Sequence, residues 1–341
     1  MTSTTDQLLT VLRDVSATPT LEYAAPPEPL TGGFWAELFI LRVTGGPVGW
    51  PADLVARLMP DAVVAAKETA IQAEVARLGF PTPTVRAAGG PADGLGRAFM
   101  VMDFAAGKPL LDGLDGLDGV KALAQLPRLA ATLPDTLASA MARLHRIDAE
   151  AVRARIKGGA AATTVTEMVD WIRSSTEDAG RPDLTGAASW LIAHPPDPAP
   201  EVVCHGDLHP FNLLVDDRHQ VTVLDWSASM LGPAAYDVAF TSLLLAEPPL
   251  TFPRPLQPVV ALAARSLSRS FRRKYRHHSG TTIDPTSLRW HQGVVCLRAL
   301  AEVAGWDDAE REMRAGHPWL ISGRAFASRL SQLTGSSVRA R

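Results

Sequence analysis

The sequence contains little cysteine, no long apolar run and almost no net charge. Cys204 and Cys296 are its only cysteines, too few for a disulfide framework, and their apolar neighbours are typical of buried free thiols. No apolar run approaches the roughly 20 residues that a membrane-spanning helix needs. The N-terminal residues also lack the basic start and apolar core of a signal peptide. These absences predict a cytoplasmic protein without a membrane partner.

Length and composition indicate an ordinary globular protein. A chain of 341 residues is long enough for two lobes, and 46% hydrophobic with 20% charged residues is typical of soluble folds. The net charge of −3 gives no case for nucleic-acid binding. Charge is unevenly placed, because residues 240–341 hold 15 Lys and Arg against 7 Asp and Glu. We expect the densest basic stretch, 272–278, to be a solvated helix face and helix end, where cations are favoured.

A β-hairpin is predicted just beyond the middle of the chain. The apolar runs 213–215 and 221–224 flank the polar stretch 216–219, which supplies turn-forming residues. Antiparallel pairing of the two runs brings Asn212 and Asp225 to the same end of the ladder.

Asp207 precedes this end of the hairpin by a few residues. One carboxylate, one amide and a second carboxylate, those of Asp207, Asn212 and Asp225, are therefore expected to converge on one polar point. Hard oxygen ligands of this kind suit Mg²⁺ together with the phosphates that it carries.

A zinc site is the competing interpretation of the cluster Cys204, His205 and His209. Ligand spacing argues against it, because adjacent residues on a strand point to opposite faces and no second Cys or His pair follows. We expect His205 to orient the loop through its ring nitrogens instead.

The spacing of these residues matches a known catalytic loop. In protein kinases the loop runs H-R-D-x-x-x-x-N. Here His205-Gly206-Asp207 and Asn212 reproduce that spacing, with Gly at the Arg position, and Asp225-Trp226 follows. This pattern resembles the aminoglycoside phosphotransferase and choline kinase-like family, whose members are small-molecule relatives of the protein kinases.

The resemblance implies a bilobal protein kinase-like fold of the α+β class. Its small β-rich N-lobe, residues 1–106, would bind the nucleotide, ATP or GTP. Its larger and mainly helical C-lobe, residues 107–341, would hold the catalytic loop and a small-molecule hydroxyl acceptor. By the same resemblance Asp207 would accept the hydroxyl proton, and Asn212 and Asp225 would bind Mg²⁺.

Two residues of the N-lobe correspond to the family's phosphate-aligning ion pair. Arg57, on a predicted strand 53–59, stands where the family places a cation, and Glu68, on a predicted helix 65–78, stands where it places the partner acid. Glu74 is the competitor for that acid, but it lies nearly two turns further along the helix. A surface-facing arginine on an edge strand is the alternative for Arg57.

Two further segments correspond to nucleotide-binding parts of the family. Gly32 and Gly33 would let backbone amides approach phosphate, although a plain β-turn explains them equally well. A buried strand from residue 97 would lead into the hinge that binds adenine, with a core strand that binds no ligand as the alternative. The hinge residues are Met102, Asp103, Phe104 and Ala105.

Asp237 matches the family's G-x-x-x-x-D-h-A element. The resemblance makes it a brace of the catalytic loop, whereas position alone makes it a simple cap at a helix start, and both roles are compatible.

The acceptor is not named by these motifs. Aminoglycosides are polycations that need clustered carboxylates, which Glu167, Asp170, Glu177 and Asp178 would supply, whereas the basic C-terminal part favours neutral or anionic acceptors. We therefore predict an ATP-dependent phosphotransferase acting on a small-molecule hydroxyl, with a non-catalytic nucleotide-binding scaffold as the alternative. A protein kinase is disfavoured, because no A-P-E follows Asp225.

Overall fold

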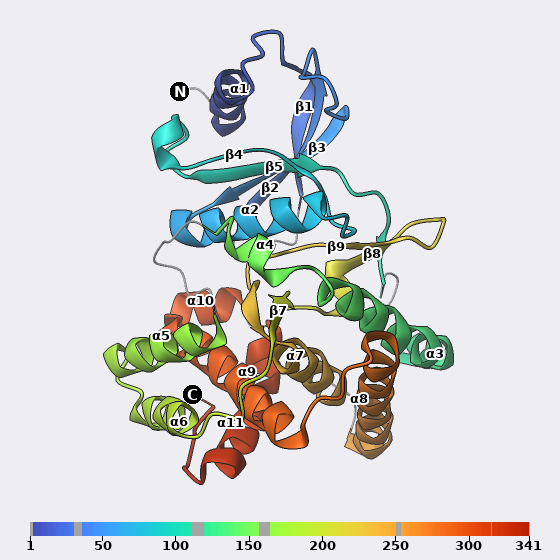
Figure 1. The fold of residues 1–341 in the computed structure, drawn as a ribbon, viewed down its shortest axis with the longest axis vertical. Coiled ribbons are helices and arrows are strands. Elements are labelled where there is room, and N and C mark those ends of the chain that lie inside the picture. The colour runs from blue at the N-terminus through green and yellow to red at the C-terminus, as the bar shows by residue number, and fades with distance from the viewer. Residues whose placement is uncertain are drawn as a thin grey trace. The chain divides into compact units, whose positions relative to one another are not determined.

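The computed structural model describes residues 3–30, 36–110, 119–156, 164–249, 254–314 and 316–340, which divide between two units (Figure 1). The first unit comprises Met1–Leu110, Glu150–Ala161 and Phe211–Ser229. The second comprises Leu111–Ala149, Ala162–Pro210 and Met230–Arg341. The first unit thus spans the whole of the predicted N-lobe together with the predicted hairpin, and the lobe boundary at residue 106 stays a prediction.

An antiparallel five-stranded sheet forms the centre of the first unit, in the order β1-β2-β3-β5-β4. Its strands are β1 (Glu22–Leu30), β2 (Glu37–Thr44), β3 (Asp53–Met59), β4 (Val85–Gly89) and β5 (Ala98–Asp103). The predicted strand 53–59 is confirmed as β3, which lies between β2 and β5 and is therefore hydrogen-bonded on both sides.

The proline-rich stretch 25–29 lies within β1, although proline lacks the N–H that strand pairing on both sides requires. This strand pairs only with β2, and its register shifts between Tyr23 and Ala25 and again between Ala25 and Glu28. An edge strand needs ladder donors on one side only, and its irregularities accommodate residues that lack an N–H.

Helices cover the two faces of this sheet, α1 (Thr4–Val15) on one and α2 (Ala62–Arg77) on the other (Figure 1). Leu8 and Leu12 of α1 belong to one apolar cluster with buried residues of β2, β3 and β5. Ala65 of α2 belongs to a second cluster formed on the opposite face. Asp61 caps α2 by accepting hydrogen bonds from the N–H groups of its first turn.

The predicted hairpin is confirmed as β8 (Leu213–Val215) and β9 (Val221–Val223), with β6 (Lys108–Pro109) completing a three-stranded sheet. The Asp216 carboxylate closes the turn by accepting the N–H groups of Arg218 and Gln220 at 2.9 and 2.7 Å. The Leu224 N–H donates to the Asn212 carbonyl at 2.8 Å, so Asn212 and Asp225 flank the same end of the ladder, as expected.

The second unit is mainly helical. It contains α3 (Gly119–Leu144), α5 (Val165–Asp178), α6 (Pro182–Ala193), α7 (Ala234–Ala246), α8 (Gln257–Ser279), α9 (Pro285–Gly305), α10 (Asp308–Met313) and α11 (Pro318–Thr334), and the short α4 (Ala149–Arg153) begins at its border. Two short strands, β7 (Glu201–Cys204) and β10 (Met230–Pro233), pair antiparallel. Helices α5, α6, α7, α9 and α11 share one apolar core. No described helix is long and apolar enough to cross a membrane.

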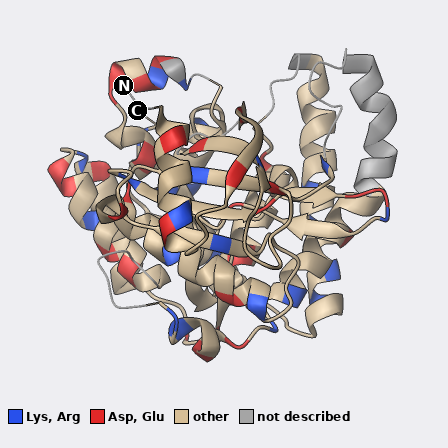
Figure 2. Cartoon of the chain, turned by 90° about the horizontal axis from the view of Figure 1, so that it is seen from above, with Lys and Arg blue, Asp and Glu red and all other residues tan. Residues whose placement is uncertain are grey.

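The basic stretch 272–278 forms the C-terminal part of α8, as predicted. Its arginines are exposed, whereas Lys274 and His278 both contact the Asp135 carboxylate of α3, at 2.8 and 3.1 Å. Acidic and basic residues are otherwise interspersed along the described elements (Figure 2). The stretch is therefore a solvent-facing helix end with one local counter-ion.

Candidate functional site

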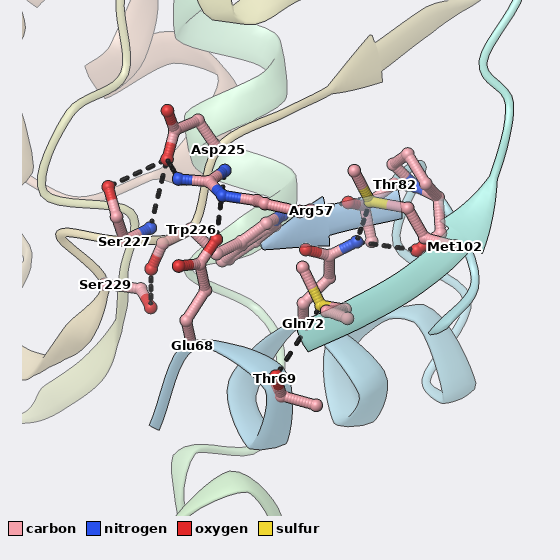
Figure 3. Close-up of polar contacts among 12 residues, drawn as sticks. Arg57, Glu68, Thr69, Gln72, Thr82, Met102, Asp225, Trp226, Ser227 and Ser229 are labelled. Atoms are coloured by element: carbon pink, nitrogen blue, oxygen red, sulfur yellow. Dashed lines mark hydrogen bonds and ion pairs between the residues drawn. The ribbon is translucent and has the colours of Figure 1, made fainter. Parts of the chain in front are cut away.

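A buried ion pair joins the sheet of the first unit to its helix α2. Arg57 points from the centre of β3, is only 8% exposed, and places Nη1 at 3.1 Å from Oε1 of Glu68, which is 1% exposed (Figure 3). The predicted contact between Arg57 and Glu68 is therefore present, while its role in aligning phosphates stays a prediction; the alternative of a surface arginine on an edge strand is wrong, because Arg57 is buried on a central strand. The competitor Glu74 instead contacts Arg77 and Arg155, at 2.6 and 3.3 Å.

Asp225 approaches the same guanidinium from the end of the hairpin. Its Oδ1 lies 3.2 Å from Nη2 of Arg57 and also accepts the N–H and the hydroxyl of Ser227, at 3.2 and 2.7 Å (Figure 3). The backbone of Asp225 has φ of 62°, in the left-handed region that few residues other than glycine adopt. Strain at one residue is thus accepted where the chain turns this carboxylate towards Arg57.

Burial and charge act in opposite directions on this triad. Burial raises the pKa of Glu68 to about 7, although the charge of Arg57 opposes the shift. For Arg57 burial alone would lower the pKa, but the carboxylates of Glu68 and Asp225 outweigh it and the pKa rises. The guanidinium therefore stays charged, and its Nε is buried with no hydrogen-bond partner among the described residues. A fixed cation with an unused donor suits an additional anionic ligand.

Trp226 fixes the hairpin against the loop that follows α2. Its side chain is fully buried, its Nε1 donates to the Thr82 hydroxyl at 2.8 Å, and its ring meets Phe80 edge-on with centroids 5.7 Å apart. The Val223 N–H adds a bond to the Pro81 carbonyl at 2.8 Å. These contacts fix the backbone at Trp226. They therefore also fix the position of the adjacent residue Asp225, which carries the carboxylate (Figure 3).

The predicted hinge begins with the last two residues of β5 and continues into the two residues after it. The N–H of Asp103 donates to Thr84 and that of Phe104 to Asp53, while the Asp103 carboxylate forms a two-pronged pair with Arg86 at 2.6 and 2.8 Å. Met102 contacts Gln72 through its sulfur, at 3.2 Å. The backbone N–H groups of Asp103 and Phe104 are thus already used in hydrogen bonds within the fold. The Ala105 N–H makes no hydrogen bond among the described residues.

The catalytic loop predicted around Asp207 lies in the second unit. Asp237, in the first turn of α7, accepts the N–H groups of His205 and Gly206 at 2.8 and 2.7 Å. The Asp207 N–H donates to Nδ1 of His205 at 3.3 Å, and the Asp207 carboxylate lies 3.5 Å from Nε2 of His209. The predicted brace is confirmed for Asp237, and His205 orients the loop as expected.

A buried polar chain supports Asp237 in turn. Nε2 of His145 lies 3.1 Å from its carboxylate, and Nδ1 of His145 lies 2.8 Å from the Tyr275 hydroxyl of α8. Burial alone would raise the pKa of Asp237, but the hydrogen bond and charge of His145 outweigh it and the pKa falls. Asp237 is thus an ionised carboxylate that holds two backbone amides of the loop.

The zinc interpretation gains no support. The ligand atoms of His145, Cys204 and Asp237 lie within 4.8 Å of one another, but the Cys204 thiol donates to the carbonyls of Gly232 and Pro233. Burial raises the pKa of this thiol well above its usual range, which favours the protonated thiol. By contrast, Asn212 and Asp225 offer the amide and carboxylate oxygens that Mg²⁺ prefers.

The structure brings together part of the predicted site. Arg57, Glu68 and Asp225 are in contact, and Asn212 flanks the same hairpin end as Asp225. Asp207 belongs to the other unit, so its convergence with Asn212 and Asp225 stays a prediction. Gly32 and Gly33 lie outside the described residues. Sequence reasoning did not identify Ser227, which follows Asp225 by two positions and bonds its carboxylate.

Comparisons with known proteins agree with this geometry. Residues 28–278 match the model of the phosphotransferase enzyme family. The fold is similar to a putative aminoglycoside phosphotransferase from Ralstonia eutropha JMP134, with a TM-score of 0.66, 19% identity and 97% of each chain covered. It is also similar to a mutant of aminoglycoside phosphotransferase APH(4)-Ia in a ternary complex with ADP and hygromycin B, with a TM-score of 0.58, 17% identity and coverage of 96% of this chain and 98% of that one.

A curated relative, acyl-CoA dehydrogenase family member 10 of Mus musculus, is 26% identical over 194 residues. That match covers 54% of this chain and 17% of the mouse protein, so the chain corresponds to a minor part of that relative. The structural likenesses show the α+β protein kinase-like fold that the resemblance implies. The family match covers most of the sequence, and the chain therefore belongs to the phosphotransferase enzyme family.

Proposed function

We propose that the protein transfers the γ-phosphate of ATP to a hydroxyl group of a small molecule. The contact of Arg57 with both Glu68 and Asp225 carries this proposal. A buried cation held between a structural acid and a second acid at a hairpin end is the arrangement that phosphoryl transfer requires for aligning phosphates. If Arg57 had a purely structural role, its Nε donor without a described partner would only cost free energy at this depth. A second, partly exposed carboxylate, that of Asp225, would also be unnecessary.

The nucleotide site is assigned to the first unit. Arg57 would bind phosphate oxygens while Glu68 keeps its guanidinium in place, and Gly32 and Gly33 would offer backbone amides. The adenine would lie beside Met102, Asp103, Phe104 and Ala105. Because the N–H groups of Asp103 and Phe104 already bond Thr84 and Asp53, Ala105 is the hinge residue whose N–H would bond the ring.

Asn212 and Asp225 fit a magnesium ion by the chemistry of their oxygens and their place at one hairpin end. Bound there, Mg²⁺ would supply positive charge to the phosphate oxygens. The Asp225 oxygen that contacts Arg57 would then have to be shared or released. Asn212 contributes a neutral ligand, so the net charge of the donor set stays low.

Asp207 is the proposed general base. It would orient the acceptor hydroxyl and receive its proton as the hydroxyl oxygen attacks the γ-phosphorus and the bond to the ADP oxygen breaks. Asp237 and His205 hold the loop on which Asp207 stands. Positioning and charge neutralisation account for most of such catalysis, so the rigidity of this loop is part of the mechanism.

The acidic helix α5 gives limited support to an aminoglycoside acceptor. The Glu167 carboxylate accepts the Thr164 N–H at 3.1 Å as part of a helix cap, and Glu177 contacts Arg173 at 3.7 Å. Of the four carboxylates considered for a polycation, these two already have local partners. The acceptor panel must therefore include neutral and anionic alcohols alongside aminoglycosides.

The proposal is tested by ATP-dependent ADP release across that panel, with mass spectrometry of the product. Wild type should add one phosphate to at least one alcohol, and Asp207→Asn should abolish the addition while retaining nucleotide binding. Retained phosphotransfer in a folded Asp207→Asn variant would remove Asp207 from its role. Thermal-shift titrations with ATP and GTP, with and without Mg²⁺, would establish the nucleotide independently.

A further inference from the structure

A second contact to the catalytic loop comes from a helix that carries no recognised motif. Arg298 lies on α9 among the buried apolar residues Leu297 and Ala299. Its Nη1 donates to the Gly206 carbonyl at 2.7 Å and to the Tyr236 hydroxyl at 3.0 Å. Gly206 is therefore bonded by a charged side chain from each of two helices, α7 and α9.

Neighbouring polar and charged groups offset the free-energy cost of burying the Arg298 guanidinium. Burial alone would lower the pKa of Arg298, but its interaction with the Tyr236 hydroxyl and the charges of the Asp207 and Glu302 carboxylates outweigh that effect, and the pKa rises. The guanidinium thus remains charged next to the carboxylate that we propose as the base. A charged donor to a carbonyl forms one of the stronger hydrogen bonds in a protein.

Two successive peptide groups of the loop are fixed in this way. Asp237 accepts the N–H of Gly206, which belongs to the peptide from His205, and Arg298 bonds the carbonyl of Gly206, which belongs to the peptide leading to Asp207. Gly206 has φ of 74°, a conformation that a side chain would disfavour. The loop therefore depends on outside partners to hold the direction in which it enters Asp207.

We propose that Arg298 is a positioning residue for phosphotransfer, which holds the Gly206–Asp207 peptide from α9 and so fixes the direction of the Asp207 carboxylate. Protein kinases carry an arginine inside the loop, at the place of Gly206. This chain has glycine there and brings a guanidinium to the same residue from 92 positions further along the sequence. The inference rests on the proposed function of Asp207.

The test replaces Arg298 and compares it with another arginine of the same unit. Arg298→Met removes both bonds at similar side-chain length, and Arg298→Lys keeps the charge and one donor. Arg329→Met is the matched control, because Arg329 bonds Gln292 of α9 at 3.2 Å and has no contact with the described loop. Steady-state kinetics give kcat and KM, and thermal unfolding reports the stability of each variant.

Arg298→Met should lower kcat about 100-fold, the scale of a misplaced catalytic group, while the KM for ATP stays unchanged. Arg298→Lys should recover part of kcat, and Arg329→Met should keep it despite a similar loss of thermal stability. Wild-type kcat in folded Arg298→Met would overturn the inference, as would an equal loss in the control. If Arg298→Met does not fold, Arg298→Gln takes its place, because its shorter uncharged side chain does not reach the Gly206 carbonyl, and a wild-type kcat in folded Arg298→Gln would overturn the inference.

Hydrogen–deuterium exchange of the segment 203–209 tests the positioning without any catalytic readout. Exchange in this segment should be faster in Arg298→Met than in wild type and Arg329→Met. Equal protection in all three proteins would overturn the inference even if phosphotransfer is found. Faster exchange together with an inactive wild type would instead leave the loop contact standing and contradict the proposed function.

Discussion

Arg57 and Asp225 are 168 positions apart in the sequence, yet Nη2 of the first lies 3.2 Å from Oδ1 of the second. The residue proposed to bind phosphate and the residue proposed to bind metal therefore form an ion pair with each other. Glu68, at 3.1 Å on the other side, keeps the guanidinium in place when Asp225 is released. Under the proposed function, Glu68 is therefore the structural carboxylate of the triad and Asp225 the one that binds metal.

Removing the shared cation should destabilise the protein strongly. Arg57→Met leaves the buried Glu68 without its partner, and breaking a buried ion pair on one side costs about 3 kcal/mol or more. Urea unfolding measures this loss. Arg42→Met on the neighbouring strand β2 is the control, because its ion pairs with Glu28 and Asp53 are exposed and should contribute little. Equal unfolding free energies for the two variants would contradict the account.

Trp226 should be needed for the stability of the first unit as well as for the proposed metal site. Trp226→Ala removes a fully buried ring and should cost about 3–5 kcal/mol, whereas Trp226→Phe, which loses the bond to Thr82, should cost about 1 kcal/mol. Both variants should also weaken Mg²⁺-dependent stabilisation by ATP in thermal-shift titrations. Trp171→Ala, at a position 64% exposed, should change neither quantity, and a comparable effect there would discount the role of Trp226.

Stability of the second unit should fall in mild acid because of His291. This residue of α9 is 1% exposed, its Nδ1 lies 2.8 Å from the Ser287 carbonyl, and burial lowers its pKa to about 4. The unfolded chain binds the proton near pH 6.5 and the folded chain does not. The contribution of neutral His291 to the free energy of unfolding is therefore fully present above pH 6.5. As the pH falls towards 4, the free energy of unfolding decreases by about 3 kcal/mol.

Urea unfolding followed by tryptophan fluorescence between pH 7 and 4 measures this slope. His291→Asn keeps a donor for the Ser287 carbonyl but does not titrate, so its slope should be shallower than that of wild type. Some slope should remain, because burial also lowers the pKa of His317 to about 4. Parallel pH dependence of wild type and His291→Asn would show that His291 is not the group responsible.

Local patterns predicted much of the fold and a good part of the site. Short-range signals sufficed for β3, α2 and the hairpin, because hydrophobic periodicity and turn residues act over a few positions. The strand β1 was missed, because whether proline is tolerated depends on a strand being at the sheet edge, which is a property of the assembled sheet.

Contacts between distant residues were harder to predict. The contact of Arg57 with Asp225 depends on how the hairpin packs against the loop after α2, through Trp226 and Thr82, and no local pattern carries that information. Arg298 had a weak signal that went unused. It is a lone cation in the apolar run 294–300, and a charge at such a position needs a buried partner.

Mg²⁺-dependent hydrolysis of ATP in the absence of acceptor tests the central claim most directly, because water can replace an unidentified alcohol. Wild type should release phosphate slowly and only with Mg²⁺, while Asp225→Ala and Asp207→Asn should release none. Arg42→Met, outside the site, should behave as wild type. Hydrolysis that persists in Asp225→Ala would contradict the assigned site, and none in wild type with saturating ATP would favour a non-catalytic nucleotide-binding scaffold.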